Sequence, residues 1–260
     1  MALLKLPTVT LCAATSVNVD ATLAAIEASC EGIAFGDVIL FTDASPVPVP
    51  AHVRIVPIEP LRSGADYSAF ILQRLASHLR TEHCLVVQWD GFVLEPEQWD
   101  GAFLEYDYIG ATWPQFDDDH DVGNGGFSLR SKRLLEACAD ADFVPSHPED
   151  VAICRRNRTF LEERFGIRFG DRDTAARFSF ERSRPAQPSF GFHGVFNMIE
   201  AVGEDRFWFL YRRLDERSSV ARDLGLILRQ LRGPRRLSRR VRMMLDRAGD
   251  LLRAQSPRRL

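Results

Sequence analysis

A carboxylate at the end of an apolar run is the first residue of the sequence that could do chemistry. Asp90 follows Leu85-Val86-Val87 within the segment Gln88-Trp89-Asp90-Gly91, and the apolar run predicts a buried parallel strand. Gln88 and Asp90 are two residues apart, so their side chains point to the same side of an extended chain. Because an isolated buried charge is costly, Asp90 must cap the next helix, pair with an arginine, or hold a divalent cation for a phosphate-bearing substrate.

Three later segments combine glycines with polar side chains. They are the glycine-rich GNGGFSLRS at Gly123–Ser131, the acid pair Glu149-Asp150, and FGFHG at Phe190–Gly194. Each also has a purely structural interpretation. Asn124-Gly125-Gly126 could form a hairpin turn, the acid pair suits the first turn of a helix, and His193 could be a hydrogen-bonded core histidine.

The elements that must position these residues alternate between strands and helices. We expect strands at Val9–Ala14, Asp37–Thr42, Val53–Ile58 and around Leu85, with helices at Ala21–Cys30 and from Ser63 to Leu79. This alternation predicts an α/β fold with a mostly parallel sheet, whose ligands bind at the carboxyl ends of the strands. Later elements are expected at Pro96–Leu104 (helix), Tyr106–Ala111 (strand), Lys132–Ala139 (helix), Glu149–Phe165 (helix) and Ala176–Glu181 (strand).

Length and composition favour one large domain followed by a tail. The chain has 260 residues, enough to bury a core. Its five cysteines are odd in number and form no C-x-x-C pair, which indicates free thiols in a reducing compartment. The sequence shows neither the long apolar region of a signal peptide nor the roughly 18 uncharged apolar residues of a membrane-spanning helix, so we expect a cytoplasmic location.

The tail differs from the body in charge. From Arg212 to the end the chain carries fifteen arginines and five acids, a formal charge of +10, whereas the rest carries −13. We therefore expect an acidic catalytic domain over residues 1–213 and a basic helical tail over residues 214–260. Gly233-Pro234 divides the tail into two amphipathic helices.

Three partners are compatible with this tail. Its apolar residues could pack on the body or on another protein, or the tail could attach to an anionic membrane surface. Nucleic-acid binding is disfavoured, because no known motif is present and aromatic residues are absent after Tyr211.

The order of the four chemical segments resembles the A-type (GT-A) fold of nucleotide-sugar glycosyltransferases. It is most similar to an uncharacterised bacterial glycosyltransferase-like family with a Q-x-D-G motif, and the resemblance extends from Thr8 to Val195. It implies a Rossmann-related, mostly parallel sheet flanked by helices. In that fold an acid after the fourth strand binds the metal, which implies this role for Asp90, while Gln88 replaces the usual first acid and can still bond hydroxyls.

The resemblance also implies the remaining roles. His193 would complete the metal site, and Glu149-Asp150 would supply the catalytic base of an inverting enzyme. Thr15, Ser16 and Asp43 would contact the nucleoside, and Asn124, Gly125 and Gly126 would let the backbone approach the sugars. Trp113 offers a flat apolar face for a sugar, with core packing as the alternative.

These roles predict a metal-dependent, hexosyltransferase-like enzyme of bacterial polysaccharide biosynthesis. It would use Mn²⁺ or Mg²⁺ and a nucleotide-sugar donor, with a UDP-sugar favoured, and a glycan or lipid-linked acceptor at the inner face of the membrane. The alternative is a catalytically silent scaffold of the same fold, which the replacement of an acid by Gln88 favours. A glycoside hydrolase also uses paired carboxylates, but the motif order disfavours it.

Overall fold

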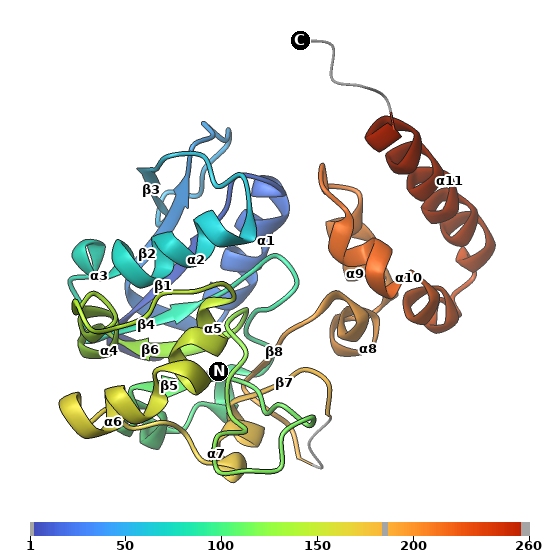
Figure 1. Cartoon of the computed structure of the whole chain (residues 1–260). Coiled ribbons are helices and arrows are strands. Elements are labelled where there is room, and N and C mark those ends of the chain that lie inside the picture. The colour runs from blue at the N-terminus through green and yellow to red at the C-terminus, as the bar shows by residue number, and fades with distance from the viewer. Residues whose placement is uncertain (1–2, 184–186, 256–260) are drawn as a thin grey trace. The chain divides into compact units, whose positions relative to one another are not determined.

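The computed structural model describes residues 3–183 and 187–255 (Figure 1). The chain divides into two compact units, Met1–Gly194 and Val195–Leu260. The first contains all four segments named above. The predicted boundary between residues 213 and 214 falls inside the second unit, because two further helices belong to that unit as well.

A six-stranded sheet forms the centre of the first unit, in the order β3-β2-β1-β4-β6-β5. Its strands are β1 (Leu4–Ala14), β2 (Ile33–Thr42), β3 (Arg54–Pro57), β4 (His83–Val86), β5 (Tyr108–Ile109) and β6 (Ser128–Ser131). The first four pair in parallel, whereas β6 runs antiparallel to both β4 and β5. The predicted α/β class with a mostly parallel sheet is confirmed.

Alternating side chains bury both faces of this sheet. On one face, Leu11 of β1 belongs to the same core as Leu23 and Ile26 of α1 (Val19–Cys30). On the other, Cys12 of β1 joins the core formed with α2 (Gly64–Gln73), α3 (Leu75–His78) and α4 (Lys132–Ala137). Full burial of one such leucine contributes about 1.5–3 kcal/mol. The result is a three-layer α/β unit that holds the carboxyl ends of β1, β2 and β4 at one edge.

The chain turns sharply after β4. Val87 donates its N–H to Cys12 of β1 at 2.9 Å, and then Gln88 and Gly91 exchange both backbone hydrogen bonds at 3.0 Å. Asp90 therefore lies in a tight, doubly bonded turn at the carboxyl end of β4. This position fits the expectation that ligands bind beyond the carboxyl ends of parallel strands.

The second half of the first unit is built from short elements. Two 3₁₀ turns, η1 (Pro96–Gln98) and η2 (Gly101–Glu105), replace the helix predicted there. Then come α5 (Glu149–Val151), the π-helical turn η3 (Ala152–Arg156), α6 (Arg158–Phe165), α7 (Arg172–Phe178), β7 (Ser179–Phe180) and β8 (Gly191–Phe192). The strand predicted over Ala176–Glu181 is wrong for its first half. Asp171 caps α7 by accepting the N–H of Thr174, and the helix continues to Phe178.

The second unit is helical throughout its described elements. It contains η4 (Val195–Asn197), α8 (Met198–Val202), α9 (Glu204–Tyr211), α10 (Ser218–Gln230) and α11 (Arg236–Gln255). The predicted break at Gly233-Pro234 is confirmed, since it lies between α10 and α11. Over the described residues, none of the helices combines the length and apolar character required to cross a membrane. All five cysteines are free thiols.

Candidate active site

A short parallel strand pair brings a histidine and a glutamate together. In the register of β7 and β8, Phe180 pairs with Phe192, so the residues that follow them, Glu181 and His193, lie side by side. The N–H of His193 donates to the carbonyl of Phe180 at 2.9 Å. The Nδ1 atom of His193 lies 3.3 Å from Oε1 of Glu181. Glu181 is absent from the residues expected from the sequence.

The turn after β4 approaches the other edge of the same imidazole ring. The Nε2 atom of His193 lies 3.2 Å from Oε1 of Gln88 and 3.7 Å from Oδ1 of Asp90. The N–H of Gly194 donates to the carbonyl of Asp90 at 2.9 Å. The structure therefore brings together Gln88, Asp90 and His193, three residues expected to share a site.

Two glycines leave room for the imidazole ring of His193. A Cβ atom on Gly126 would lie 2.0 Å from the His193 ring, and one on Gly91 would lie 2.7 Å from it. Both distances are too short for real contacts. The glycines of the two segments thus accommodate the protein's own histidine.

The charges around His193 favour its protonated form. Burial lowers the pKa of His193, but the carboxylates of Glu181 and Asp90 raise it, and the net pKa lies above the ordinary value. Burial raises the pKa of Glu181, whereas His193 lowers it, with a net decrease. Glu181 also accepts a hydrogen bond from the side-chain amide of Asn124. Asn124 has a φ of 61°, a left-handed conformation that asparagine tolerates better than most residues.

Asp150 contacts the glycine-rich segment directly. Its Oδ2 atom accepts the N–H of Gly125 at 3.0 Å, and Oδ1 accepts the N–H of Val151 at 2.8 Å. Burial is the main cause that raises the pKa of Asp150, and the charge of Glu149 raises it further. A helix dipole would lower the pKa of an acid at this position, but its effect does not prevail here. Helix α5 contains only three residues, and desolvation outweighs any field from so short a helix.

Glu149 forms a buried ion pair with Arg130. Nη2 of Arg130 lies 2.9 Å from Oε1 of Glu149, and the same Nη2 donates to the carbonyl of Gly125 at 3.2 Å. Both side chains are buried. A Cβ atom on Gly125 would lie 2.3 Å from Oε1 of Glu149. Glu149 is therefore engaged in positioning Gly125 and Arg130, and Asp150 is the acid of the pair with greater exposure.

The remaining expected residues lie at the same sheet edge or in the core. Thr15 donates its N–H to Phe41 at the end of β2, and the hydroxyl of Ser16 accepts the N–H of Leu61 at 2.7 Å. Asp43 is exposed just after β2. Trp113 is only 7% exposed, and its ring fills the space above Gly123, which agrees with core packing as opposed to a sugar platform.

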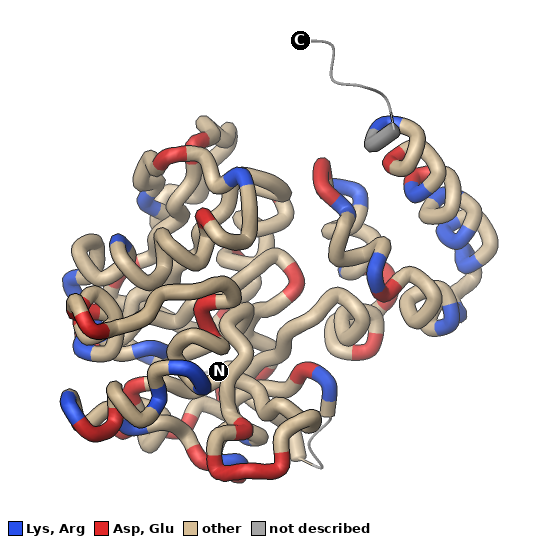
Figure 2. Tube along the Cα trace, in the orientation of Figure 1, with Lys and Arg blue, Asp and Glu red and all other residues tan. Residues whose placement is uncertain are grey.

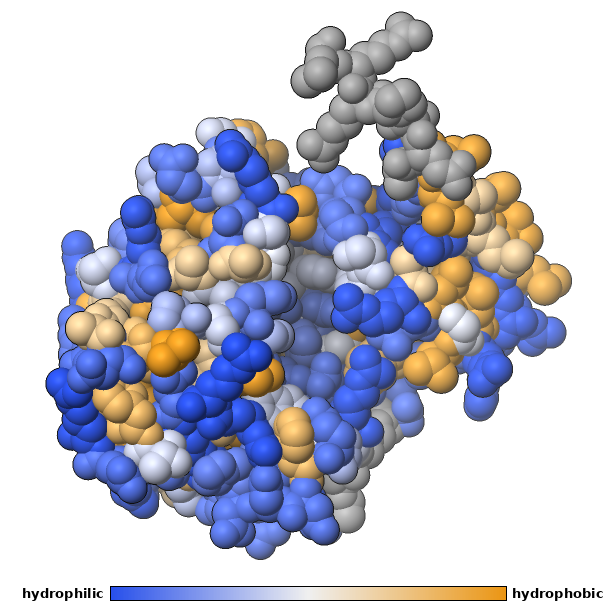
Figure 3. All heavy atoms as spheres, in the orientation of Figure 1, coloured by the Kyte–Doolittle hydropathy of each residue, from blue (hydrophilic) through white to orange (hydrophobic). Residues whose placement is uncertain are grey.

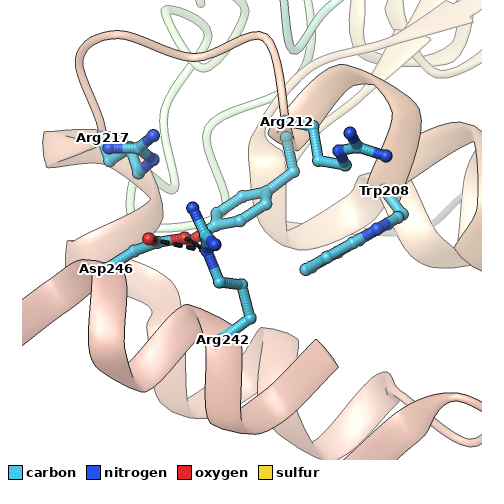
Figure 4. Close-up of a pocket in the computed structure, with 6 residues that line it drawn as sticks. Trp208, Arg212, Arg217, Arg242 and Asp246 are labelled. Atoms are coloured by element: carbon cyan, nitrogen blue, oxygen red, sulfur yellow. Dashed lines mark hydrogen bonds and ion pairs between the residues drawn. The ribbon is translucent and has the colours of Figure 1, made fainter. Parts of the chain in front are cut away.

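Two cavities lie away from this site. One of about 580 Å³ lies at the amino end of β4 and is lined by residues that include His83, Asp107 and Arg133. Another of about 370 Å³ lies in the second unit between α9 and α11 (Figure 4). Within residues 3–183 and 187–255, no cluster of three or more histidines, cysteines or acids has the arrangement of a metal site.

The sequence of this chain matches a known protein family. Residues 50–193, more than half of the chain, match the family described as "Protein of unknown function (DUF5672)". The chain belongs to this family. The matched DUF5672 region contains the turn after β4, the glycine-rich segment and the acid pair, and it ends at His193.

Further comparisons concern curated proteins and solved structures. No curated protein matches the chain. Among solved structures it is similar to the "Crystal structure of a glycosyltransferase involved in the glycosylation of the major capsid of PBCV-1". The sequence identity is 13% and the TM-score 0.46, over 79% of this chain and 100% of the other.

Proposed function

We propose that this chain is a metal-dependent glycosyltransferase. It moves a sugar from a nucleotide-sugar donor, with UDP as the favoured nucleotide, to a hydroxyl of a glycan or lipid-linked acceptor. The observation that carries this proposal is the 3.7 Å approach of His193 Nε2 to Asp90 Oδ1 at the carboxyl end of β4. Parallel α/β sheets bind their ligands at this edge.

The donor atoms around His193 suit a divalent cation. Carboxylate oxygen and imidazole nitrogen are both accepted by Mn²⁺, and Asp90 and His193 would each provide one donor. The ion would displace the proton from Nε2 of His193, and Glu181, 3.3 Å from Nδ1, would keep the remaining proton on Nδ1. The described residues offer no three-donor cluster, so we expect the diphosphate oxygens to complete the coordination. When bound, the cation would neutralise the leaving diphosphate.

Asp150 is the proposed general base. A carboxylate is most effective in this role when its pKa approaches the working pH, and burial raises the pKa of Asp150 in that direction. Its two backbone hydrogen bonds, from Gly125 and Val151, fix the carboxylate in place. The buried pair of Glu149 with Arg130 supports Gly125 from behind.

The reaction follows from these roles as a single displacement. The acceptor oxygen forms a bond to the anomeric carbon while its proton passes to Asp150, and the bond between that carbon and the diphosphate oxygen breaks with its electron pair. One base and one displacement give a product of inverted configuration. A product that keeps the anomeric configuration of the donor would contradict this assignment.

Donor binding and hydrolysis test the proposal. The midpoint of thermal unfolding should rise with UDP plus Mn²⁺ more than with UDP alone, and the purified chain should slowly hydrolyse at least one nucleotide-sugar. GDP in parallel tests the preference for uridine. Asp90→Asn should abolish the Mn²⁺-dependent part of the shift. Asp119→Asn, an exposed acid in a loop, is the matched control and should behave as the parent chain.

A catalytically silent scaffold is the alternative function. It is favoured by Gln88, whose amide occupies the place of an acid and lies 3.2 Å from His193. Nucleotide binding without hydrolysis or transfer of any donor sugar would support the scaffold and exclude the enzyme. For either function we propose a cytoplasmic location.

A further inference from the structure

Helix α11 presents its polar face to its own unit and its apolar face outward. Its inward residues include Arg239 and Met243, which are buried, and Asp246 and Asp250, which are half-buried. Five of its outward apolar residues are between 44% and 68% exposed: Leu237, Val241, Met244, Leu245 and Leu251. A surface helix of a globular domain normally shows the opposite polarity. We call these five side chains the apolar row.

Polar contacts attach α11 to the rest of the second unit. Arg239 pairs with Glu204 of α9 at 2.8 Å, Tyr211 of α9 donates its hydroxyl to Asp246 at 2.9 Å, and Arg217 lies 3.5 Å from Asp250. Figure 4 shows Asp246 between Arg217 and Arg242 on the side of α11 that faces α9. Helix α11 thus docks through hydrogen bonds and ion pairs, and the apolar row is not used for this docking.

Arginines follow one border of the apolar row. Arg236, Arg240 and Arg247 are four and seven residues apart, a spacing that places them on one side of a helix. The two acids of α11, Asp246 and Asp250, lie on the docked face. Figure 2 shows the basic residues along α11, and Figure 3 shows apolar side chains gathered over the same helix. Arginine stems can cover apolar surface while their guanidinium groups reach phosphates.

We propose that the apolar row and its border of arginines bind the surface of an anionic phospholipid membrane. The helix would lie in the interface plane, with its apolar side chains at the acyl boundary and its arginines at the lipid phosphates. A 20-residue helix would extend about 30 Å along the surface. Charge complementarity favours lipid over the same helix of a second copy, because residues 212–260 carry +10 and two such tails repel each other. This inference does not depend on the proposed function.

Vesicle flotation of the full chain tests the proposal. At low salt the protein should float with vesicles of phosphatidylcholine and phosphatidylglycerol and stay in solution with vesicles of phosphatidylcholine alone. Added salt should weaken the binding, because it screens the arginines. Failure to float with the anionic vesicles at low salt, or equal binding to both kinds of vesicle, would overturn the proposal.

Matched variants separate the contribution of the apolar row to membrane binding from that of the arginines. Val241→Asn with Leu245→Gln changes two exposed side chains of the apolar row and should weaken binding at least about tenfold. Val144→Asn, at an exposed valine of the first unit, should not weaken binding.

A second pair of variants tests the arginines. Arg236→Gln with Arg247→Gln should weaken binding about 30-fold, whereas Arg222→Gln with Arg229→Gln on α10 should have a smaller effect. If the two arginine pairs lose equal affinity, the binding depends on net charge and not on the border of the apolar row. If Val241→Asn with Leu245→Gln binds no more weakly than Val144→Asn, the apolar row is rejected.

The oligomeric state in solution tests whether a second copy of the chain, and not a membrane, covers the apolar row. If the row binds a second copy, the full chain sediments as a dimer at high salt, and Val241→Asn with Leu245→Gln converts it to a monomer. That result, together with absence of vesicle binding, would replace the membrane by a homodimer.

Discussion

The Oε1 atom of Glu181 lies 3.3 Å from Nδ1 of His193, while Nε2 of the same ring faces Gln88 and Asp90. The two residues follow paired positions of β7 and β8, so the backbone fixes their separation. A carboxylate on one ring nitrogen sets the tautomer and leaves the other nitrogen for a ligand. Glu181 therefore completes the candidate site from behind.

Replacing Glu181 by glutamine should weaken cation binding without removing a proposed ligand. We expect Glu181→Gln to lower the affinity for Mn²⁺ in the presence of UDP by about 10–100-fold, the usual effect of losing such a supporting carboxylate. Titration with Mn²⁺, followed by electron paramagnetic resonance of the free ion, measures this change. Glu163→Gln, an exposed acid on α6, is the control. Parent-like affinity in a folded Glu181→Gln variant would contradict the role of Glu181.

The absence of a side chain at Gly126 should be as important for Mn²⁺-dependent UDP binding as the imidazole of His193. In Gly126→Ala the added methyl group would lie 2.0 Å from the ring, so His193 must leave its present position beside Asp90. We expect Mn²⁺-dependent UDP binding to fall about tenfold or more, since geometry errors near 1 Å have effects of this order. Gly101→Ala is the control, because nothing lies within 4 Å of its Cβ position. Equal binding by both variants would show that the ring position is unimportant.

The sheet and most of its helices could be predicted from the sequence because their signals are local. The apolar runs around Leu11, Leu40 and Leu85 gave the parallel strands, and helical spacing gave α1 and α2. The short elements were harder. The predicted helix at Pro96–Leu104 is two 3₁₀ turns, because Asp100 accepts the N–H of Ala102 and starts a second turn.

The candidate site was predicted only in part because its partners are distant in sequence. Asp90 and His193 were expected together from motif order, but Glu181 joins them through a pairing of two-residue strands, which have too few residues for a periodic signal. Glu149 pairs with Arg130 because both are buried, and an arginine inside a strand is usually predicted from sequence to be exposed. Two short apolar runs, Ser179-Phe180 and Gly191-Phe192, each followed by a polar residue, are the signal that could have identified Glu181.

The raised pKa of Asp150 predicts a pH profile with a known sign. In the proposed role of Asp150 as the base the carboxylate is the active form, so turnover should fall as the pH drops through a pKa above the ordinary aspartate value. Asp150→Asn should reduce turnover by about 10²–10⁴-fold and leave Mn²⁺-dependent UDP binding intact. Rates over a pH series with the favoured donor measure both effects, with Asp119→Asn as the control. An unchanged rate in Asp150→Asn would exclude Asp150 as the base.

The same pKa shift has a consequence for stability. Burial favours the protonated form of Asp150 in the folded state, so its contribution to stability is complete below the unfolded pKa of about 3.9. That contribution is lost as the pH rises through the higher folded pKa. The free energy of unfolding attributable to Asp150 should therefore decrease with rising pH across this window. Comparison of parent and Asp150→Ala by urea unfolding at several pH values measures it, and an increase would contradict the assigned shift.

Breaking the ion pair of Arg130 with Glu149 should destabilise the first unit strongly. The side chain of Arg130 is fully buried, and its loss leaves Glu149 as an uncompensated buried charge. We expect Arg130→Met to lower the free energy of unfolding by about 3–5 kcal/mol, measured by urea denaturation. Arg164→Met, at a half-exposed arginine that pairs with the exposed Asp142, is the control and should cost less.

A double variant separates the pair from the individual side chains. Arg130→Met with Glu149→Gln removes both charges, so it should recover part of the stability lost in Arg130→Met. Donor binding should remain weaker than in the parent, because Gly125 loses the hydrogen bond from Arg130 to its carbonyl. If the double variant is instead less stable than Arg130→Met by the full effect of Glu149→Gln alone, the two side chains are energetically independent. That result would contradict a stabilising pair between Arg130 and Glu149.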